Sequence, residues 1–390
     1  MNLNPKIVES HSQLASWRRD IHAHPELAFN EHRTSQFVID QLFQAGIEVF
    51  TGIGKTGVLG RLKVGTSNRS IGLRADLDAL PMQENNEFAH RSGVDGVFHG
   101  CGHDGHTIML LGAALQLAKQ RNFDGTVYFI FQPAEEGMGG ADAMIEDGLF
   151  DDHQMDFVFG MHNWPGMPVG EIGVRVGPMM AAFEKFDVTI QGIGGHGAMP
   201  HLCVDPIPVA AQIIQALQTV VSRTVDPMKS AVLSITQVHA GDAYNVIPES
   251  TTLSGAIRFL DKNVGQQIMT RMKKIVSATA EAAGASADLI FQPLGYPALV
   301  NDSSATDLAV KSACAVLGQD KVDSNIEPVL ASEDFASMLE QRPGCYVFIG
   351  NGVDSEGGCM VHHPEYDFND DVIPVGASYW VRLTEDCLGP

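Results

Sequence analysis

Hydrophobic residues near the N-terminus recur every three to four positions. The spacing predicts an amphipathic helix over residues 6–24, with Ile7, Leu14 and Ile21 on its apolar face. It predicts a second helix over residues 31–45. Because each helix has a single apolar stripe, we expect both of them to cover a sheet.

Short runs rich in β-branched and aromatic residues follow and alternate with helical segments. Residues 58–64, 71–74, 126–132 and 156–161 are predicted to be strands. A helix is predicted among them over residues 106–121. Such alternation is typical of a parallel or mixed sheet covered by helices, so the predicted fold class of this region is α/β.

The pattern changes near residues 177–184. The next elements are predicted in the order strand, helix, strand, strand, helix, strand, over residues 184–191, 205–222, 231–238, 251–259, 264–283 and 287–292. This βαββαβ order predicts helices on a mostly antiparallel sheet, the ferredoxin-like α+β arrangement. After Pro293 the α/β pattern resumes, with helices predicted over 303–317, 333–340 and 375–386 and a strand over 345–349.

These elements predict a catalytic domain that is divided between the two ends of the chain. Residues 1–183 form its first part, residues 294–390 form its second part, and residues 184–293 form an inserted domain. The length of 390 residues fits more than one domain, and a hydrophobic content of 44% is ample for a buried core.

The charge balance restricts the partners. The chain has 25 basic and 47 acidic residues, a formal net charge of −22, and no basic run. This balance argues against binding to nucleic acid or to an anionic membrane surface. Bound cations would neutralise part of the acidity.

The six cysteines are scattered and form no CxxC pair, which in a chain of this length favours reduced thiols and a cytosolic location. The N-terminal segment lacks the apolar core of a signal peptide, and no run of about 18 apolar residues occurs. We therefore expect neither secretion nor a membrane span.

Two glycine-rich stretches carry the GxGxxG pattern of nucleotide-binding loops, but neither fits such a loop. Residues 52–57 lack the first glycine of a phosphate loop, because Val49 stands there, and a predicted strand follows. Residues 192–197 do follow a strand, but Pro200 and the prolines after it prevent an immediate helix. We interpret the first stretch as a turn and the second as a flexible tip that presents His196.

The hexapeptide Cys101–His106 holds a thiol, two imidazoles and a carboxylate just before an apolar helical run. Cys101 and His103 stand two residues apart on a glycine-containing loop, so both could turn toward one ion. The alternative is a reactive surface loop with spare histidines. Only ligands from other segments would decide for a metal site.

Potential ligands also stand at the ends of predicted strands. Asp76, the pair Glu135 and Glu136, and His162 each follow an apolar run. In open α/β sheets ligands bind beyond the carboxyl ends of the strands, so these groups are expected to converge. A single acid at such a position could equally be a helix cap or a turn residue.

The collected ligands exceed one tetrahedral site. They are Cys101, His103, Glu136, His162 and one of the pair His362 and His363. Five ligands suit two ions about 3.5–4 Å apart, and a thiol among imidazoles and carboxylates fits Zn, Mn, Co or Ni better than Mg or Ca. Glu135 would face the water as general base, since adjacent side chains diverge in extended backbone. The alternative for Glu135 and Glu136 is a solvated acidic pair.

Several motifs in order resemble a known family. They span nearly the whole chain and are Leu73–Pro81, Cys101–His106, Gln132–Gly137, Gly160–Pro165, Gly194–His201, Gly241–Pro248, Ser332–Phe335 and His362–Asp367. In these motifs the chain resembles the dinuclear metal-dependent amidohydrolases that cleave N-acyl amino acids, above all the hippurate hydrolase group with its aminoacylase and carboxypeptidase relatives. Gly100, where relatives usually carry Ala, is a small departure.

The resemblance implies a role for each candidate residue. The implied metal ligands are Cys101, His103, Glu136, His162 and His362, the implied general base is Glu135, and the implied substrate contacts are His196, Asn245 and Arg258. His362 is preferred to His363 because the family's histidine stands two residues before a proline. The planar fork of Arg258 suits a substrate carboxylate, although most arginines at strand ends are solvated.

The resemblance further implies two divalent ions per subunit, a small N-acyl amino acid as substrate, and a homodimer joined through the inserted domain. That domain would serve as a lid, and its His196 would enter the active site of the partner. A dipeptidase or carboxypeptidase on the same scaffold is the nearest alternative activity. A relative that binds metal or a conjugate without hydrolysis is the alternative from another class, and the presence of Glu135 weighs against it.

Overall fold

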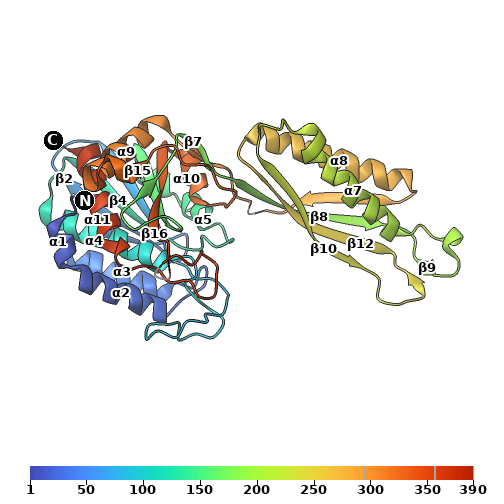
Figure 1. The fold of residues 1–390 in the computed structure, drawn as a ribbon, viewed down its shortest axis with the longest axis horizontal. Coiled ribbons are helices and arrows are strands. Elements are labelled where there is room, and N and C mark those ends of the chain that lie inside the picture. The colour runs from blue at the N-terminus through green and yellow to red at the C-terminus, as the bar shows by residue number, and fades with distance from the viewer. Residues whose placement is uncertain (294, 355–356, 390) are drawn as a thin grey trace. The chain divides into compact units, whose positions relative to one another are not determined.

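The computed structural model describes residues 1–293, 295–354 and 357–389. The chain divides into two units (Figure 1). The first comprises Met1–Met179, Val300–Glu327 and Asp334–Pro390, and the second comprises Met180–Leu299 and Pro328–Glu333. The second unit therefore includes a short segment, 328–333, that lies far from the rest of it in sequence.

An eight-stranded sheet forms the centre of the first unit, in the order β1-β2-β4-β3-β5-β16-β6-β15. The strands are β1 (Glu48–Ile53), β2 (Gly57–Val64), β3 (Ser70–Asp76), β4 (Gly125–Gln132), β5 (Phe157–Pro165), β6 (Ile172–Gly173), β15 (Val322–Asp323) and β16 (Gly344–Gly352). The neighbours β4, β3, β5 and β16 are parallel, whereas β2 is antiparallel to β4 and β6 is antiparallel to β16. The prediction of a mixed sheet covered by helices is confirmed.

Helices cover both faces of this sheet (Figure 1). They are α1 (Pro5–Glu9), α2 (His11–Ala23), α3 (His32–Gln44), α4 (His103–Gln120), α5 (Gly140–Glu146), α6 (Leu149–Asp152), α9 (Ser303–Leu317), α10 (Phe335–Gln341) and α11 (Val372–Leu388), with a 3-10 turn at Gln319–Lys321. On one face α4 and α11 pack against each other and against the central strands. On the other face α5 packs against α10.

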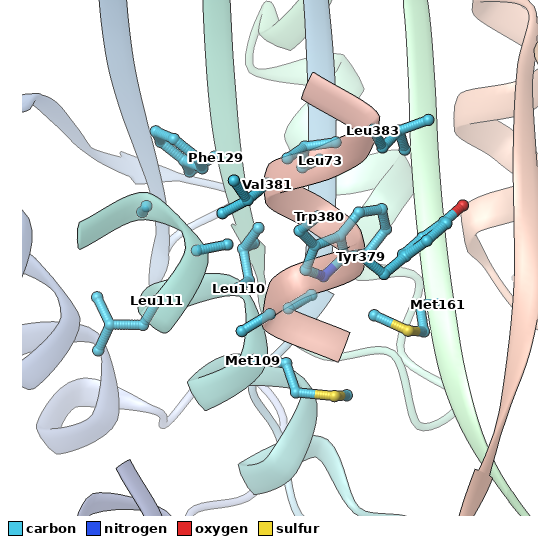
Figure 2. Packing of buried hydrophobic residues seen from close by; sticks show 14 of the residues in the cluster. Leu73, Met109, Leu110, Leu111, Phe129, Met161, Tyr379, Trp380, Val381 and Leu383 are labelled. Carbon is cyan, nitrogen blue, oxygen red and sulfur yellow. The ribbon is translucent and has the colours of Figure 1, made fainter. Parts of the chain in front are cut away.

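The core of this unit lies between the sheet and the helices α4 and α11. Leu110 of α4 and Trp380 of α11 meet Leu73 and Phe129 of the sheet there, as Figure 2 shows. Helix α4 is buried on nearly all sides, because its sequence from Thr107 onward is apolar almost all round. Its N-terminus, which carries the ligand hexapeptide, is therefore held by the core.

The second unit contains a four-stranded antiparallel sheet with two helices. Its strands are β8 (Ala182–Gln191), β10 (Ala231–Ala240), β12 (Ser250–Phe259) and β13 (Ser286–Phe291), in the order β10-β12-β8-β13, and its helices are α7 (Pro206–Thr224) and α8 (Lys262–Ala282). The element order is βαββαβ. Smaller elements are the ribbon of β9 (Gly195–His196) with β11 (Val246–Ile247) and a 3-10 turn at Pro200–Leu202. The paired strands β7 (Gly177–Met180) and β14 (Leu299–Asn301) each contain a boundary between the two units.

Several predicted elements have other bounds in the structure: the strand expected over 345–349 extends to Gly352, and the helix expected over 375–386 begins at Val372. Three other elements also differ. The helix expected over residues 6–24 is broken at Ser10, whose hydroxyl donates to the carbonyl of Lys6. A serine side chain that bonds to the backbone in this way favours a bend in a helix. The helix expected from His106 begins at His103, because Gly102, at φ +90°, takes the N-cap position. The strand expected to end at Met161 continues through Pro165, so His162 lies within it.

No disulfide joins the six cysteines, all of which belong to the described part of the chain. Among the helices of the described residues, none combines the length and the apolar character that crossing a membrane requires.

Candidate metal centre

The ligand candidates of the first unit gather beyond the carboxyl ends of β3, β4 and β5. Asp76 ends β3, and the turn after β4 carries Glu135 and Glu136. His162 projects from β5. The N-terminus of α4 adds Cys101 and His103, so a sheet edge and a helix end bound the site.

Ligand atoms in the site form two groups that share Cys101. The inner ligand group consists of Cys101, His103 and His162, all buried, and its ligand atoms lie within 4.8 Å of one another. The outer ligand group consists of Cys101, Glu136 and His362 and meets the same limit. A thiol common to both groups is the arrangement expected of a bridging ligand between two ions.

Neighbouring groups fix which nitrogen each buried imidazole presents. Nδ1 of His103 lies 3.2 Å from Oδ1 of Asp78, and Nδ1 of His162 lies 2.6 Å from the carbonyl oxygen of Asn163. In both rings Nδ1 donates, because a carboxylate or a carbonyl can only accept. Nε2 of each ring is therefore left to bind a metal, the outer-shell arrangement common to metal-binding histidines.

Buried charges surround His103. Burial opposes a proton on this imidazole, but Asp76, Asp78 and Glu136 outweigh burial and raise the pKa of His103 to about 10. Asp76 shows the opposite balance. Burial favours the neutral acid, yet His103, His106 and Arg74 hold the pKa of Asp76 well below its usual range. The buried carboxylates around His103 thus attract positive charge to the site.

His162 has a different environment from that of His103. Burial, together with the neighbouring His106, lowers the pKa of His162 well below its usual range. A neutral imidazole is the form that binds metals. Sγ of Cys101 lies 3.3 Å from Nε2 of His162, so two of the three candidate ligand atoms of the inner group are adjacent.

Glu135 and Glu136 lie in a turn and not in extended backbone, which corrects the sequence-based reason for their divergence. Ala134, just before them, has φ +54°, and the backbone N–H of Glu136 donates to Oδ2 of Asp78 at 2.9 Å. Glu135 is buried and belongs to a further cluster with His103 and Glu136, whose ligand atoms also lie within 4.8 Å. The turn thus places both carboxylates at the site.

The outer group is completed from the C-terminal part of the chain. Nε2 of His362 lies 3.2 Å from Oε1 of Glu136, and the backbone N–H of His362 donates to the carbonyl of Gly100 at 2.7 Å. Its side chain is 52% exposed. His363 has a different contact, since its Nδ1 lies 3.1 Å from Sγ of Cys359.

The donor set fits divalent metal ions of the transition series. Nε2 of His103 and Oε1 of Glu136 are buried and make no hydrogen bond among the described residues, although Oε1 has Nε2 of His362 as an ion-pair neighbour at 3.2 Å. Leaving such atoms without a hydrogen bond is costly, and a cation between them would satisfy both. A thiol with imidazoles and a carboxylate suits Zn, Mn, Co or Ni without selecting one of them.

In the second unit, His196 and Asn245 lie side by side on the ribbon of β9 and β11. His196 pairs with Val246, and the N–H of Gly197 donates to the carbonyl of Asn245 at 2.8 Å. Both side chains are exposed. Nδ1 of His196 accepts from the N–H of Ala198 at 3.1 Å, so the neutral ring carries its proton on Nε2.

Arg258 lies on β12 of the same unit. Its guanidinium donates to the carbonyl of Leu330 at 2.7 Å and to the hydroxyl of Ser332 at 2.8 Å, and it lies 4.5 Å from the ring centroid of Phe183. Burial lowers the pKa of Arg258. The side chain is therefore held in place and is not a freely solvated surface arginine.

Sequence reasoning did not assign the groups that orient the ligands. Asp78 lies within the motif Leu73–Pro81, and Asn163 directly follows His162, but nothing in the sequence showed what they contact. Nor did the sequence assign a role to His106. The structure places its Nδ1 2.6 Å from Oδ1 of Asp76 and its Nε2 2.7 Å from Oδ1 of Asn163, behind the ligands.

Comparisons with known proteins show the family. Residues 72–386 match peptidase family M20/M25/M40. The chain is 42% identical over 383 residues to hippurate hydrolase from Campylobacter jejuni, with 98% of each chain covered. It is 38% identical over 387 residues to thermostable carboxypeptidase 1 from Saccharolobus solfataricus, with 97% of each chain covered.

A solved structure gives the same result. A dinuclear metal-binding peptidase of the M20 family from Bacillus subtilis matches with a TM-score of 0.84 at 35% identity, and 98% of each chain is covered. The resemblance seen in the sequence motifs is therefore confirmed. The chain belongs to peptidase family M20/M25/M40.

Proposed function

We propose that this chain hydrolyses the amide bond of N-acyl amino acids with the help of two divalent metal ions. The observation that carries the proposal is the pair of ligand groups that share Cys101, with Glu135 beside them. Bound ions would supply Lewis-acid activation of the acyl carbonyl and of the attacking water. The ligands would be Cys101, His103, Glu136, His162 and His362.

Glu135 would move the proton. As a buried carboxylate beside both ligand groups, it is placed to accept a proton from water while the water oxygen forms a bond to the acyl carbon. Cleavage of the C–N bond then releases the amine, and Glu135 returns the proton to the amine nitrogen. The products are a carboxylic acid and an amino acid.

The second unit would bind the rest of the substrate and serve as a lid. The Nε2–H of His196 is available as a donor to the oxyanion that develops on the acyl oxygen. Asn245, next to it on the ribbon, could donate to an amide or carboxylate oxygen. The charged fork of Arg258 would bind the amino acid's carboxylate, since planar pairing of this kind is strong and specific.

We further propose that the chain forms a homodimer through this second unit. The support is a set of large apolar side chains that are exposed around the His196 ribbon, namely Ile193, Met199, Leu202, Tyr244 and Val246. An exposed apolar patch of this kind favours association, and a two-fold symmetric dimer is the commonest outcome. In such a dimer His196 would act in the active site of the partner subunit.

Subunit mixing tests the shared site. Glu135→Gln and His196→Ala chains, each inactive alone, are mixed under conditions that allow exchange. If His196 acts across the dimer, half of the dimers are mixed and each has one intact site, so roughly a quarter of wild-type activity returns. No recovery despite demonstrated exchange would mean that His196 acts in its own subunit or not at all.

A substrate panel tests the function itself. Hippurate, N-acetyl amino acids and dipeptides are assayed with Mn²⁺ or Co²⁺, and we expect hydrolysis of the N-acyl amino acids. A preference for dipeptides or peptide C-termini would favour the carboxypeptidase alternative, which the 38% identity to such an enzyme supports. Metal binding without hydrolysis of any substrate would favour the non-hydrolytic alternative.

Glu135→Gln is the matching variant. This variant should keep the metal ions. Its rate of hydrolysis should fall by more than about 10²–10⁴-fold, the loss that removing a general base typically causes. Glu146→Gln, on the exposed surface of the nearby helix α5, is the control and should remain fully active. Undiminished turnover in the Glu135 variant would refute its role.

A further inference from the structure

The segment 357–371, here named the ligand loop, has to hold His362 in an unusual state. His362 is more than half exposed and has φ +63°, a backbone conformation that non-glycine residues seldom adopt. Such a conformation persists only where the surrounding structure enforces it. The contacts of the ligand loop therefore determine whether His362 completes the outer ligand group.

The ligand loop has several attachments to the rest of the unit, including hydrogen bonds to Asn85, Asn86 and Asn351. Three of its attachments reach a residue next to another candidate ligand. The N–H of His362 donates to Gly100, which precedes Cys101. The hydroxyl of Tyr366 accepts from Asn163, which follows His162. Through Arg18, the loop is also joined to Asp104, which follows His103.

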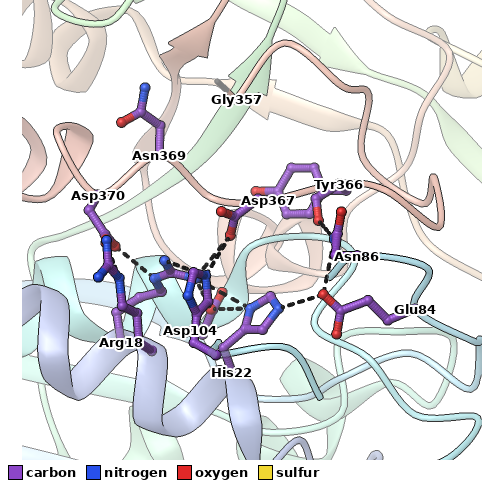
Figure 3. A network of polar contacts seen from close by, with 12 residues as sticks. Arg18, His22, Glu84, Asn86, Asp104, Gly357, Tyr366, Asp367, Asn369 and Asp370 are labelled. Atoms are coloured by element: carbon purple, nitrogen blue, oxygen red, sulfur yellow. Dashed lines mark hydrogen bonds and ion pairs between the residues drawn. The ribbon is translucent and has the colours of Figure 1, made fainter. Parts of the chain in front are cut away.

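Arg18 makes the third attachment from helix α2 (Figure 3). Its Nη1 lies 3.1 Å from Oδ1 of Asp367 and 3.4 Å from Oδ2 of Asp104, and its Nε lies 2.8 Å from Oδ1 of Asp370. The side chain is 1% exposed. Although burial opposes its charge, the three carboxylates outweigh burial and raise the pKa of Arg18, so the guanidinium stays charged.

Asp104 has a second partner that is fully buried, whereas the second partners of Asp367 and Asp370 are partly exposed. Nδ1 of His22, one helical turn after Arg18, lies 2.8 Å from Oδ2 of Asp104, and Nε2 of His22 lies 3.3 Å from Glu84 (Figure 3). Without Arg18, Asp104 and the adjacent His103 would keep this support. Among the described residues, Asp367 would keep only Nε2 of His90, at 3.4 Å, and the carboxylate of Asp370 would keep Arg19, at 2.7 Å on the surface.

From this asymmetry we propose that Arg18 is a positioning residue for His362, and that it stabilises the outer ligand group selectively over the inner one. The proposal rests on the proposed ligand set. Arg18 touches no candidate ligand itself. It acts by clamping the ligand loop to the N-terminus of α4, and planar two-sided pairing with carboxylates is a capacity that lysine lacks.

The test is a titration of the metal-free full-length chain with Co²⁺, in which the affinities of the first and second ions are resolved separately. In Arg18→Gln we expect the second ion to bind about 10- to 100-fold more weakly, the range typical of losing an outer-shell partner, and the first ion to bind as in the wild type. Arg18→Lys should recover part of the loss. Arg33→Gln removes an exposed arginine pair with Asp20 and is the control, in which neither ion should change.

A milder variant covers the case in which Arg18→Gln does not fold. Asp367→Asn alters a side chain that is 33% exposed, and it leaves Arg18 paired with Asp104 and Asp370. This variant should also weaken the binding of the second ion alone. Where both single variants fold, the double variant should bind the second ion no more weakly than the more affected single variant, because both substitutions remove the same attachment. Unfolding by heat is measured in parallel on the metal-free chains.

The outcomes separate this proposal from the ligand assignment. If His362→Ala keeps both ions, the ligand set is wrong, whatever the Arg18 variants do. If His362→Ala loses the second ion but folded Arg18→Gln or Asp367→Asn binds both ions normally, the positioning role is refuted. Equal weakening of both ions, or lower thermal stability with unchanged binding of the second ion, would also refute it.

Discussion

Gly102 stands between two candidate ligands, and its replacement by alanine gives a sharp test of how tightly the site is packed. Its backbone has φ +90°, and a Cβ atom there would lie 2.3 Å from Oδ1 of Asn163 and 2.3 Å from the hydroxyl oxygen of Tyr366. Both distances are far below van der Waals contact. Gly102→Ala therefore combines backbone strain with a steric clash.

The two costs can be estimated separately. A left-handed backbone costs an L-residue roughly 1–2 kcal/mol. Forcing an extra carbon into a well-packed interior costs about 1–3 kcal/mol. Because Asn163 and Tyr366 are hydrogen-bonded to each other at 2.8 Å, both must move, and the expected loss in the free energy of unfolding is about 2–5 kcal/mol.

Gly46→Ala is the matched control, since Gly46 has φ +73° but no atom within 4 Å of the added carbon. Denaturant unfolding of the metal-free chains should give a loss of roughly 1–2 kcal/mol for Gly46→Ala and a clearly larger one for Gly102→Ala. Metal binding should fall only in Gly102→Ala, whose clash displaces the residue next to His162. Equal losses of stability, or normal metal binding in Gly102→Ala, would contradict the described packing.

Three further predictions concern the ligands, the substrate and the pH dependence. Cys101→Ser should weaken the binding of both ions, because both ligand groups share this thiol and a hydroxyl is a poorer ligand. Elemental analysis that finds only one ion lost would contradict a bridging role. Arg258→Ala should lower kcat/KM for substrates with a free carboxylate by roughly 10- to 150-fold more than for the corresponding amides, and equal losses would refute carboxylate binding. Burial opposes the charge of His22, but Asp104 and Glu84 outweigh it and raise the pKa of His22 from 6.5 to about 9. This raised pKa contributes up to about 3 kcal/mol to the free energy of unfolding below pH 6.5, and the contribution is lost as the pH rises through 9. In the metal-free His22→Gln variant, the free energy of unfolding should therefore decline less between pH 6 and pH 10 than in the wild type. An equal decline in both chains would contradict this role of His22.

The sequence predicted the elements of the fold because its hydrophobic periodicity is strong. Helix α3 and strand β4 lie within one or two residues of their expected bounds. The periodicity did not reveal the break at Ser10, because the side-chain hydrogen bond that Ser10 makes to the carbonyl of Lys6 leaves the hydrophobic spacing unchanged. Nor did it show that His103 already belongs to a helix, which depends on the left-handed backbone of Gly102.

The candidate site could be predicted only in part, for a related reason. Residue type and motif order point to ligand chemistry, but the division into an inner and an outer group that share Cys101 depends on which strands are neighbours. Arg18 shows the same limit. Arginines are rarely buried, and only the structure brings it together with Asp104 and Asp367 from distant parts of the chain.

The central claim is that two divalent ions, held by ligand groups that share Cys101, support hydrolysis of N-acyl amino acids. The most direct measurement removes all metal with a chelator and then titrates the chain with Mn²⁺, while bound metal and hippurate hydrolysis are followed together. We predict no activity without metal, an increase with the second ion, and a plateau at two ions per chain. Hydrolysis by the metal-free chain, or full activity with a single ion bound, would contradict the claim.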